Sequence, residues 1–553
     1  MHQFTPKLIT SLREGYSLAK FRADAMAGLT VAIIALPLAM ALGIASGATP
    51  DKGLITAVIA GFLISALGGS RLQIGGPTGA FVVVVFNIIA IHGYDGLVIA
   101  TLMAGIILII AGYLKLGQMI KFIPNPVVTG FTAGIAVIIA SSQVKDFLGL
   151  SMASVPADFV AKWQAYFSSF SSFKPLTLAV GVGVLALIIG LRRFKPRLPG
   201  FLIAILLASL IVHFLQLPVE TVGSRFPNLP AGIPMPTWPD LSLIKFKEML
   251  PSAFTIAFLA GIEALLSAVV ADGMAGTRHR SNQELVGQGF ANIASAVFGG
   301  LPATGAIART ATNIKAGAQT PVAGILHAVF ILLFILFASD LMAFVPMAAL
   351  AAILFMVAWG MSEYERFINL LAMPNSDRAI LLLTFGLTVF VDLTVAIGVG
   401  VTLASLLFMA RMSETVKIEK GESMSPDADQ LPEETGQRDS LPKGVEVFRI
   451  TGPFFFGVAG ELLDTLRRVG QSPKVIILRM RLVPILDASG VSGVSEFISQ
   501  ARNSGAEVVL SGVQAQPKEL LGRGGIDDAS PNLHFTDNYN QAIEKASLLI
   551  SEN

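Results

Sequence analysis

Long apolar runs alternate with short polar segments along the first 411 residues of the chain. A helix needs about 20 apolar residues to cross roughly 30 Å of hydrocarbon, and fewer where it is broken. The pattern therefore predicts an α-helical membrane protein with about 14 transmembrane segments. These segments are expected at residues 24–46, 52–68, 78–91, 97–113, 124–140, 175–191, 199–216, 252–271, 284–299, 304–318, 320–338, 344–360, 377–391 and 392–411.

The charges of the connecting loops predict an orientation, because lysine and arginine favour the cytoplasmic side of a membrane. Every second loop is basic, and these loops contain Arg71; Lys115 and Lys121; Arg192, Arg193, Lys195 and Arg197; Arg278 and Arg280; Lys315; and Arg366 and Arg378. We therefore expect a cytoplasmic N-terminal segment at 1–23, which has no signal-peptide pattern. An even number of spans returns the C-terminus to the cytoplasm.

Composition separates a membrane region from a soluble one. Of the 553 residues, 53% are hydrophobic and 14% are charged, whereas soluble domains carry about 25% charged residues. Residues 412–553 contain 34 charged residues, against 42 in the first 411. The sequence predicts a transmembrane domain at 24–411, an acidic linker at 412–440 and a cytoplasmic domain at 441–553.

Strand and helix patterns alternate in the last of these regions, which predicts a small α/β domain. Strands are expected at 445–450, 475–478 and 507–510, and helices at 461–469 and 492–502.

Several functional classes lack the residues that they need. The chain has no cysteine, which excludes disulfides, thiolate metal sites and thiol catalysis. Its six histidines show no ligand spacing, and no phosphate-binding glycine loop or nucleophile elbow is present. A net charge of +2 does not suggest a nucleic-acid partner. We expect no enzyme activity, no metal site and no cofactor.

Two short segments are rich in glycine and contain a proline. Gly75-Gly76-Pro77-Thr78-Gly79 opens the third predicted span, and Gly299-Gly300-Leu301-Pro302-Ala303-Thr304-Gly305 opens the tenth. These positions are equivalent if the spans form two halves of seven. Matching broken helices indicate an inverted-repeat transporter with its site between the repeats, and the N-termini of half-helices attract anions. The alternative is that the glycines only permit close helix packing.

Two charged residues stand inside predicted spans. Glu263 lies in the apolar eighth span, where a carboxylate usually marks an ion or proton pathway. Arg309 lies one to two turns inside the tenth segment, where it would attract an anion and could pair with Glu263. The alternatives are a hydrogen-bonded structural carboxylate and an arginine that snorkels to the cytoplasmic interface. Pro37 is expected to break the first span, or else to kink it without ligand contact.

Four motifs together resemble the sulfate permease (SulP) family of anion transporters. Three of them lie in predicted spans, at Gly76-Pro77-Thr78-Gly79-Ala80-Phe81, Gly261-Ile262-Glu263-Ala264-Leu265-Leu266 and Ala308-Arg309-Thr310-Ala311-Thr312-Asn313-Ile314-Lys315-Ala316-Gly317. The fourth, Val483-Pro484-Ile485-Leu486-Asp487-Ala488-Ser489-Gly490, is similar to the core of a STAS domain. The resemblance extends over nearly the whole chain.

This resemblance implies a seven-plus-seven inverted repeat, with a core domain that moves like an elevator against a gate domain, in a homodimer in the bacterial inner membrane. It places a small-anion site between the N-termini of the third and tenth helices. The residues that it implies there are Gly79, Ala80, Phe81, Gly305, Ala306, Ile307 and Arg309, with Leu38 from the first span.

The resemblance leaves the substrate and the coupling ion open. Plant sulfate carriers of the family often have glutamine at the position of Leu38, and sodium-coupled bicarbonate carriers have aspartate and a hydroxyl residue in place of Glu263 and Ile307. Ser267 still offers a hydroxyl for ion coupling beside Glu263. The stretches around Leu36–Leu42 and Asp272–Arg280 look most like the bacterial branch that takes up C4-dicarboxylates with protons. Proton-coupled uptake is therefore expected, with sodium as the alternative.

Ser489 matches the position that is phosphorylated in soluble STAS proteins. A phosphate there could switch the interface with a cytoplasmic partner, whereas the alternative is that Asp487 and Ser489 only cap the following helix. Three rival functions also remain at this stage: a nucleobase permease, a passive anion channel, and a membrane-anchored signalling protein whose output is the STAS domain.

Overall fold

The structure, a computed structural model, describes most of the chain. It describes residues 4–118, 124–152, 155–156, 158–195, 198–227, 232, 234–236, 243–391, 393–414, 416–420, 441–455 and 473–552. Two compact units are present, Met1–Thr402 and Leu403–Asn553, and each is described by itself.

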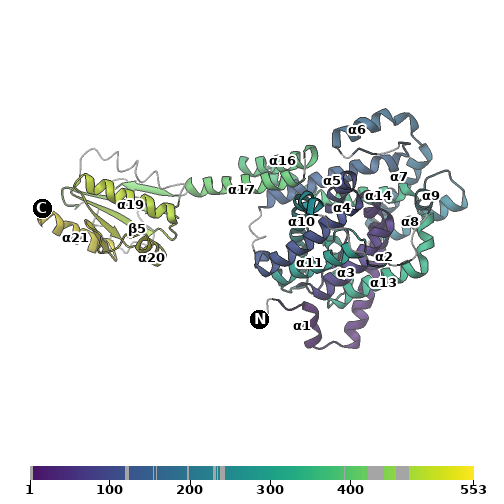
Figure 1. The fold of residues 1–553 in the computed structure, drawn as a ribbon, viewed down its shortest axis with the longest axis horizontal. Helices are drawn as coiled ribbons and strands as arrows, with labels where there is room; N and C mark the ends of the chain where they lie inside the picture. Colours follow the sequence, from purple (N-terminus) through teal and green to yellow (C-terminus); the bar gives the residue numbers. More distant parts are fainter. Residues whose placement is uncertain are drawn as a thin grey trace. The chain divides into compact units, whose positions relative to one another are not determined.

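The first unit is helical (Figure 1). Its helices are α1 (Lys7–Arg13), α2 (Leu18–Ala45), α3 (Pro50–Leu67), α4 (Ala80–Tyr113), α5 (Asn125–Leu148), α6 (Phe159–Ser168), α7 (Pro175–Phe194), α8 (Gly200–Phe214), α9 (Val222–Arg225), α10 (Leu243–Ala275), α11 (Ser281–Val297), α12 (Ile307–Lys315), α13 (Val322–Ala338), α14 (Met347–Met361), α15 (Tyr364–Leu371), α16 (Asn375–Phe390) and α17 (Leu393–Glu414), the last of which continues into the second unit. Short 3₁₀ helices occur at Phe170–Ser172 and Ser339–Phe344.

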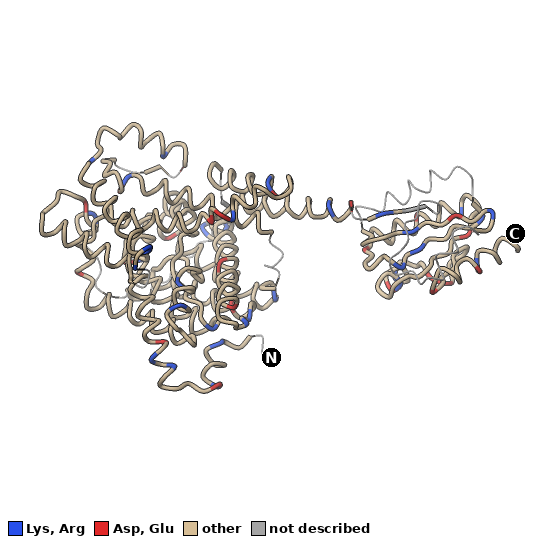
Figure 2. Tube along the Cα trace, turned by 180° about the vertical axis from the view of Figure 1, so that it is seen from behind, with Lys and Arg blue, Asp and Glu red and all other residues tan. Residues whose placement is uncertain are grey.

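The predicted membrane segments correspond to these helices. Within the described ranges, nine helices are long and apolar enough to cross a membrane, and Figure 2 shows how few charged residues interrupt them. The third and fourth predicted spans both lie in α4, on either side of Gly93, whose φ of 70° interrupts the helix. The remaining predicted spans coincide with shorter helices such as α8, α11, α12 and α16. The α-helical membrane architecture is therefore confirmed.

The helices pack in two groups. One group, centred on α3, is formed by mutual contacts among α2, α3, α4, α10, α11, α12 and α13. A second group consists of α5, α6, α7, α8, α14 and α16, which contacts the first mainly through α2 and α4. We call the first the core group and the second the gate group, after the two domains that the family resemblance implies.

Pro37 does not break the first span. It is buried within α2, which runs as one helix from Leu18 to Ala45, so the predicted interruption was wrong. Proline removes a single backbone hydrogen bond, which a well-packed helix tolerates. Packing here is close: a Cβ on Gly53 of α3 would lie 1.9 Å from the carbonyl oxygen of Ala39 in α2. Small residues at this contact let the two helix backbones meet.

The second unit contains a five-stranded sheet with the strand order β3-β4-β5-β6-β7. Its strands are β3 (Lys417–Lys420), β4 (Val445–Thr451), β5 (Val475–Leu482), β6 (Glu507–Ser511) and β7 (Leu533–Thr536), and its helices are α19 (Ala488–Asn503), α20 (Ala515–Arg523) and α21 (Tyr539–Glu552). Among these described strands, β3 pairs antiparallel with β4, and the other three pairings are parallel.

Alternate residues of the strands face two separate cores. Phe448 and Leu478 pack with Phe497 of α19, whereas Val447 and Ile477 pack in the cluster that contains Ala542 and Ala546 of α21. The expected α/β domain is confirmed, although β3 lies within the segment predicted to be a linker. The predicted helix at 461–469 falls outside the described residues.

Candidate anion site

A two-stranded antiparallel ribbon brings the two glycine-rich segments together. β1 (Gly75–Gly76) pairs with β2 (Thr304–Gly305), with Gly75 opposite Gly305 and Gly76 opposite Thr304. α4 begins four residues after β1, and α12 begins two residues after β2. Two half-helix N-termini from distant parts of the sequence are therefore held side by side.

Polar contacts reinforce this ribbon along the segment that precedes α4. The Thr310 hydroxyl accepts a hydrogen bond from the Ile74 backbone N–H at 3.0 Å, and the Ala306 N–H donates to the Ile74 carbonyl at 2.8 Å. Further along α12, the Asn313 amide donates to the Leu72 carbonyl at 2.9 Å. Because these groups are buried, their loss would leave unsatisfied polar atoms. The segments that lead into α4 and α12 are consequently joined by both backbone and side-chain hydrogen bonds.

The first turns of the two helices present backbone N–H groups beside the ribbon, of which those of Phe81 and Val82 in α4 donate to the Thr78 and Gly79 carbonyls at 3.3 and 3.1 Å. Among the described residues, no side chain caps α4 at Gly79 or α12 at Ala306. Ala80 and Phe81 are buried, whereas Ile307 is 38% exposed. Uncapped N-terminal N–H groups carry partial positive charge and bind anions. The backbone positions named from the sequence thus lie at two adjacent N-termini.

Arg309 is buried beside this ribbon and does not snorkel to an interface. Its side chain is 3% exposed, and its Nη2 donates a hydrogen bond to the Pro77 carbonyl at 2.9 Å. The Nε and Nη1 atoms have no partner among the described residues. A Cβ on Gly76 would lie 2.5 Å from Nη1, so only glycine leaves room for the guanidinium. A buried cation with free donors is suited to receive an anion.

Glu263 does not pair with Arg309, which corrects the expected ion pair. Its Oε2 accepts a hydrogen bond from the Thr78 hydroxyl at 2.7 Å, and no ion pair between Glu263 and Arg309 occurs in the described part of the chain. The two charged residues instead contact consecutive residues, Pro77 and Thr78. The loop before α4 therefore links the carboxylate to the guanidinium.

Ser267 and Leu38 lie next to residues of the site rather than at the two helix N-termini. The Ser267 hydroxyl is fully buried and lies 3.1 Å from the Thr310 hydroxyl, so it supports α12. Leu38 is half-buried and packs against the large apolar cluster that contains Ala80 and Phe81. In the described residues no group of histidine and acidic side chains is arranged to hold a metal ion.

Two buried polar residues near the site escaped the sequence analysis. Gln73 is 4% exposed and lies so close to β2 that a Cβ on Gly305 would be 1.4 Å from its Nε2. His327 in α13 is fully buried, with both ring nitrogens unpartnered among the described residues. Gln73 lies two residues after Arg71 in a predicted loop, and His327 is a single polar residue in an apolar span. Neither sequence context indicates a binding site.

Gly305→Ala is expected to lower the stability of the folded protein, because the new methyl group would overlap the Gln73 side chain. Overpacking of this kind costs about 1–3 kcal/mol. The thermal unfolding midpoint of the purified protein in detergent measures the effect. Gly183→Ala is the matched control, since a Cβ there meets no atom within 4 Å. Adding Gln73→Ala to Gly305→Ala should restore the midpoint, and a midpoint that stays low would contradict the proposed clash.

In the second unit, Ser489 is exposed in the first turn of α19. Asp487 caps this helix by accepting a hydrogen bond from the Gly490 N–H at 2.7 Å. The capping part of the sequence prediction is thus confirmed for Asp487. Phosphorylation of Ser489 stays a prediction.

Comparison with known proteins assigns the two units. The family model described as "Sulfate permease family" matches residues 21–384. The model described as "STAS domain" matches residues 441–542. The chain belongs to the sulfate permease family. As in the family, its C-terminal unit is a STAS domain, and the resemblance read from the four motifs is confirmed.

Two relatives cover almost all of the chain. "Putative sulfate transporter YvdB" of Bacillus subtilis (strain 168) is 41% identical over 530 residues, which are 96% of this chain and 98% of that protein. "Bicarbonate transporter BicA" of Picosynechococcus sp. (strain ATCC 27264 / PCC 7002 / PR-6) is 34% identical over 513 residues, 90% of each chain.

Solved structures agree with the fold of this sulfate permease family member. The transmembrane domain of a cyanobacterial BicA is 34% identical, with a TM-score of 0.64 over 69% of this chain and 99% of that one. The murine Slc26a9 anion transporter in the inward-facing state has a TM-score of 0.86 over 98% of this chain and 94% of that one, at 16% identity. The latter supports the fold alone.

Proposed function

We propose that the protein is a secondary active transporter of a small anion, which it binds between the N-termini of α4 and α12. The observation that carries this proposal is the β1–β2 ribbon, which holds two uncapped helix N-termini beside the buried Arg309 guanidinium with its free donors. Partial positive charge from both helices and a full charge from arginine favour an anion over a neutral nucleobase. The substrate class is sulfate, bicarbonate or a C4-dicarboxylate such as succinate.

Proton coupling through Glu263 is the second part of the proposal. A carboxylate within a membrane span is energetically costly, and such residues usually mark an ion or proton pathway. Its hydrogen bond with Thr78, one residue from the Pro77 carbonyl that holds Arg309, supports coupling between protonation and anion binding. Ser267 is the other candidate for ion coupling, with sodium as the alternative ion, although its contact with Thr310 favours a structural role.

Alternating access by an elevator-like motion of the core group against the gate group completes the mechanism. Gly79 lies at the boundary, since a Cβ there would be 2.6 Å from Met361 Sδ of α14 and 3.2 Å from Ile139 Cδ1 of α5. A glycine at this contact supports sliding of α4 past the gate helices. We further propose a homodimer in the bacterial inner membrane with both termini cytoplasmic, and a cytoplasmic partner for the STAS domain.

Uptake into proteoliposomes tests this proposal. Labelled sulfate, bicarbonate and succinate should be offered separately under an inward proton gradient, an inward sodium gradient or neither. We expect saturable uptake of one of the three anions that requires the proton gradient. Uptake that follows only the sodium gradient would mean that sodium, not the proton, is the coupling ion. If inserted protein takes up none of the three anions, the proposed transport function is contradicted.

If Ser489 is a regulatory phosphorylation site, Ser489→Asp and Ser489→Ala should differ in transport rate or in partner binding, because a negative charge at a helix N-terminus is stabilising and changes the surface. Uptake by the full-length variants and co-purification of cytoplasmic proteins measure the difference. Identical behaviour of both variants and the wild type would leave only the capping role of Asp487.

A further inference from the structure

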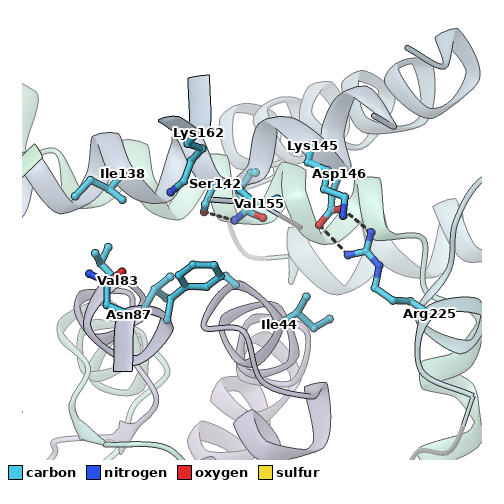
Figure 3. A pocket seen from close by; sticks show the side chains of 14 residues that line it. Ile44, Val83, Asn87, Ile138, Ser142, Lys145, Asp146, Val155, Lys162 and Arg225 are labelled. Atoms are coloured by element: carbon cyan, nitrogen blue, oxygen red, sulfur yellow. Dashed lines mark hydrogen bonds and ion pairs between the residues drawn. The ribbon is translucent and has the colours of Figure 1, made fainter. Parts of the chain in front are cut away.

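A cavity of about 130 Å³ lies between the two helix groups, apart from the β1–β2 ribbon. Figure 3 shows Ile44 and Asn87 on one side of it and Ser142 and Lys162 on the other. The first side belongs to α2 and α4, and the second to α5 and α6. Val83 also lines the cavity and stands in the first turn of α4. The cavity therefore adjoins the helix whose N-terminus forms half of the anion site.

Lys162 is the unusual residue of this cavity. It is 3% exposed, yet it makes no ion pair in the described part of the chain, and its Nζ lies 6.0 Å from the ring centre of Phe86. Burial lowers the pKa of Lys162, and the exposed Asp158 at the start of α6 acts in the opposite direction. A buried ammonium group without a close counter-charge is unfavourable, and a bound anion would relieve that cost.

The acidic groups near this cavity are already engaged. Asp146 accepts a hydrogen bond from Arg225 Nη2 at 2.6 Å, and Glu220 also pairs with Arg225. Lys145 donates to the Met152 carbonyl at 3.2 Å and forms no ion pair with any described residue. Among the described residues that line the cavity, Lys145, Lys162 and Arg225 are basic and only Asp146 is acidic, and such an excess of positive charge concentrates small anions in a cleft.

We propose that this cavity is an outer anion-binding vestibule, in which Lys162 holds a small oxyanion before the anion moves to the site between α4 and α12. This inference rests on the proposed transport function and on the orientation predicted from loop charges, which places the α5–α6 connection outside the cell. Asn87 on α4 supplies a polar group opposite Lys162. Since the two groups come from the core and gate sides, the elevator motion would close the vestibule behind the anion.

Uptake measured separately from each face of the membrane tests the vestibule. Full-length wild type, Lys162→Gln, Lys162→Arg and the control Lys174→Gln should be reconstituted with known sidedness. Labelled sulfate, bicarbonate and succinate should each be offered over a range of concentrations. Lys174 is an exposed lysine that directly precedes α7 and does not line the cavity. We expect Lys162→Gln to raise KM at the outer face about tenfold and to leave KM at the cytoplasmic face unchanged. Lys162→Arg and Lys174→Gln should resemble the wild type.

An unchanged outer KM in Lys162→Gln, or an equal change at both faces, would overturn the vestibule while leaving the transport function intact. Absence of uptake by the wild type for sulfate, bicarbonate and succinate would contradict the transport function and the vestibule with it. Because the chain has no cysteine, Ser142→Cys adds a single thiol to the cavity without changing Lys162. Whichever of sulfate, bicarbonate and succinate is transported should slow modification of this thiol by an impermeant reagent added outside, and unslowed modification would also overturn the vestibule.

Discussion

Arg309→Ala is expected to reduce anion uptake by about 100-fold or more, while the protein still inserts into the membrane. The guanidinium is buried, and two of its nitrogen atoms are unpartnered. Hydrogen bonds to a charged group contribute about 1.5–3 kcal/mol, and every 1.4 kcal/mol corresponds to about tenfold in affinity. The variant also loses the contact with the Pro77 carbonyl that orients the start of α4. Initial uptake rates in proteoliposomes, normalised to inserted protein, measure the effect.

Arg309→Lys is the matched variant, because it keeps the positive charge but loses the planar fork of donors. We expect partial uptake with a raised KM, which would separate charge from geometry. Near wild-type uptake in Arg309→Ala would show that Arg309 does not bind the anion. Size-exclusion chromatography of the protein extracted from membranes checks that the variant is inserted and folded.

Glu263→Gln is expected to abolish net uptake driven by a proton gradient. The amide oxygen of glutamine can still accept the hydrogen bond from Thr78, so the local geometry should persist. What the variant loses is the group that gains and releases a proton. Uptake measured with and without an inward proton gradient gives the result, and the gradient should have no effect on the variant.

Thr78→Val is the control for this carboxylate, since it removes the hydrogen bond and retains Glu263. We expect this variant to keep gradient-driven uptake at a reduced rate. Uptake by Glu263→Gln that still follows the proton gradient would show that another residue carries the proton, and His327 would then be the next buried titratable side chain to test.

Much of the membrane architecture could be predicted from the sequence, because hydropathy and loop charge are local properties. The paired segments around Gly76 and Gly305 were also predictable, since several glycines clustered with a proline disfavour a continuous helix. The exact hydrogen-bond partners within the site could not be predicted. Glu263 contacts Thr78, 185 residues away along the chain, and no periodic pattern specifies which of two adjacent loop residues a carboxylate will meet.

Residues that act through close packing were also missed. Gln73 and His327 are single polar residues whose role depends on which backbone they face, and only the folded arrangement places Gln73 against Gly305. The same limit applies to β3 at Lys417–Lys420, whose sequence is charged. It forms a strand because it pairs with β4 at the edge of the sheet, where polar side chains are common.

Counterflow is the measurement that tests the central claim most directly, because it detects a carrier whatever ion drives it. Proteoliposomes preloaded with unlabelled anion are diluted into a trace of the same labelled anion, with sulfate, bicarbonate and succinate examined in parallel. A single alternating site between α4 and α12 predicts transient accumulation of label with wild-type protein and none with Arg309→Ala. No accumulation of any of the three anions by the wild type, or equal accumulation by Arg309→Ala, would contradict the account.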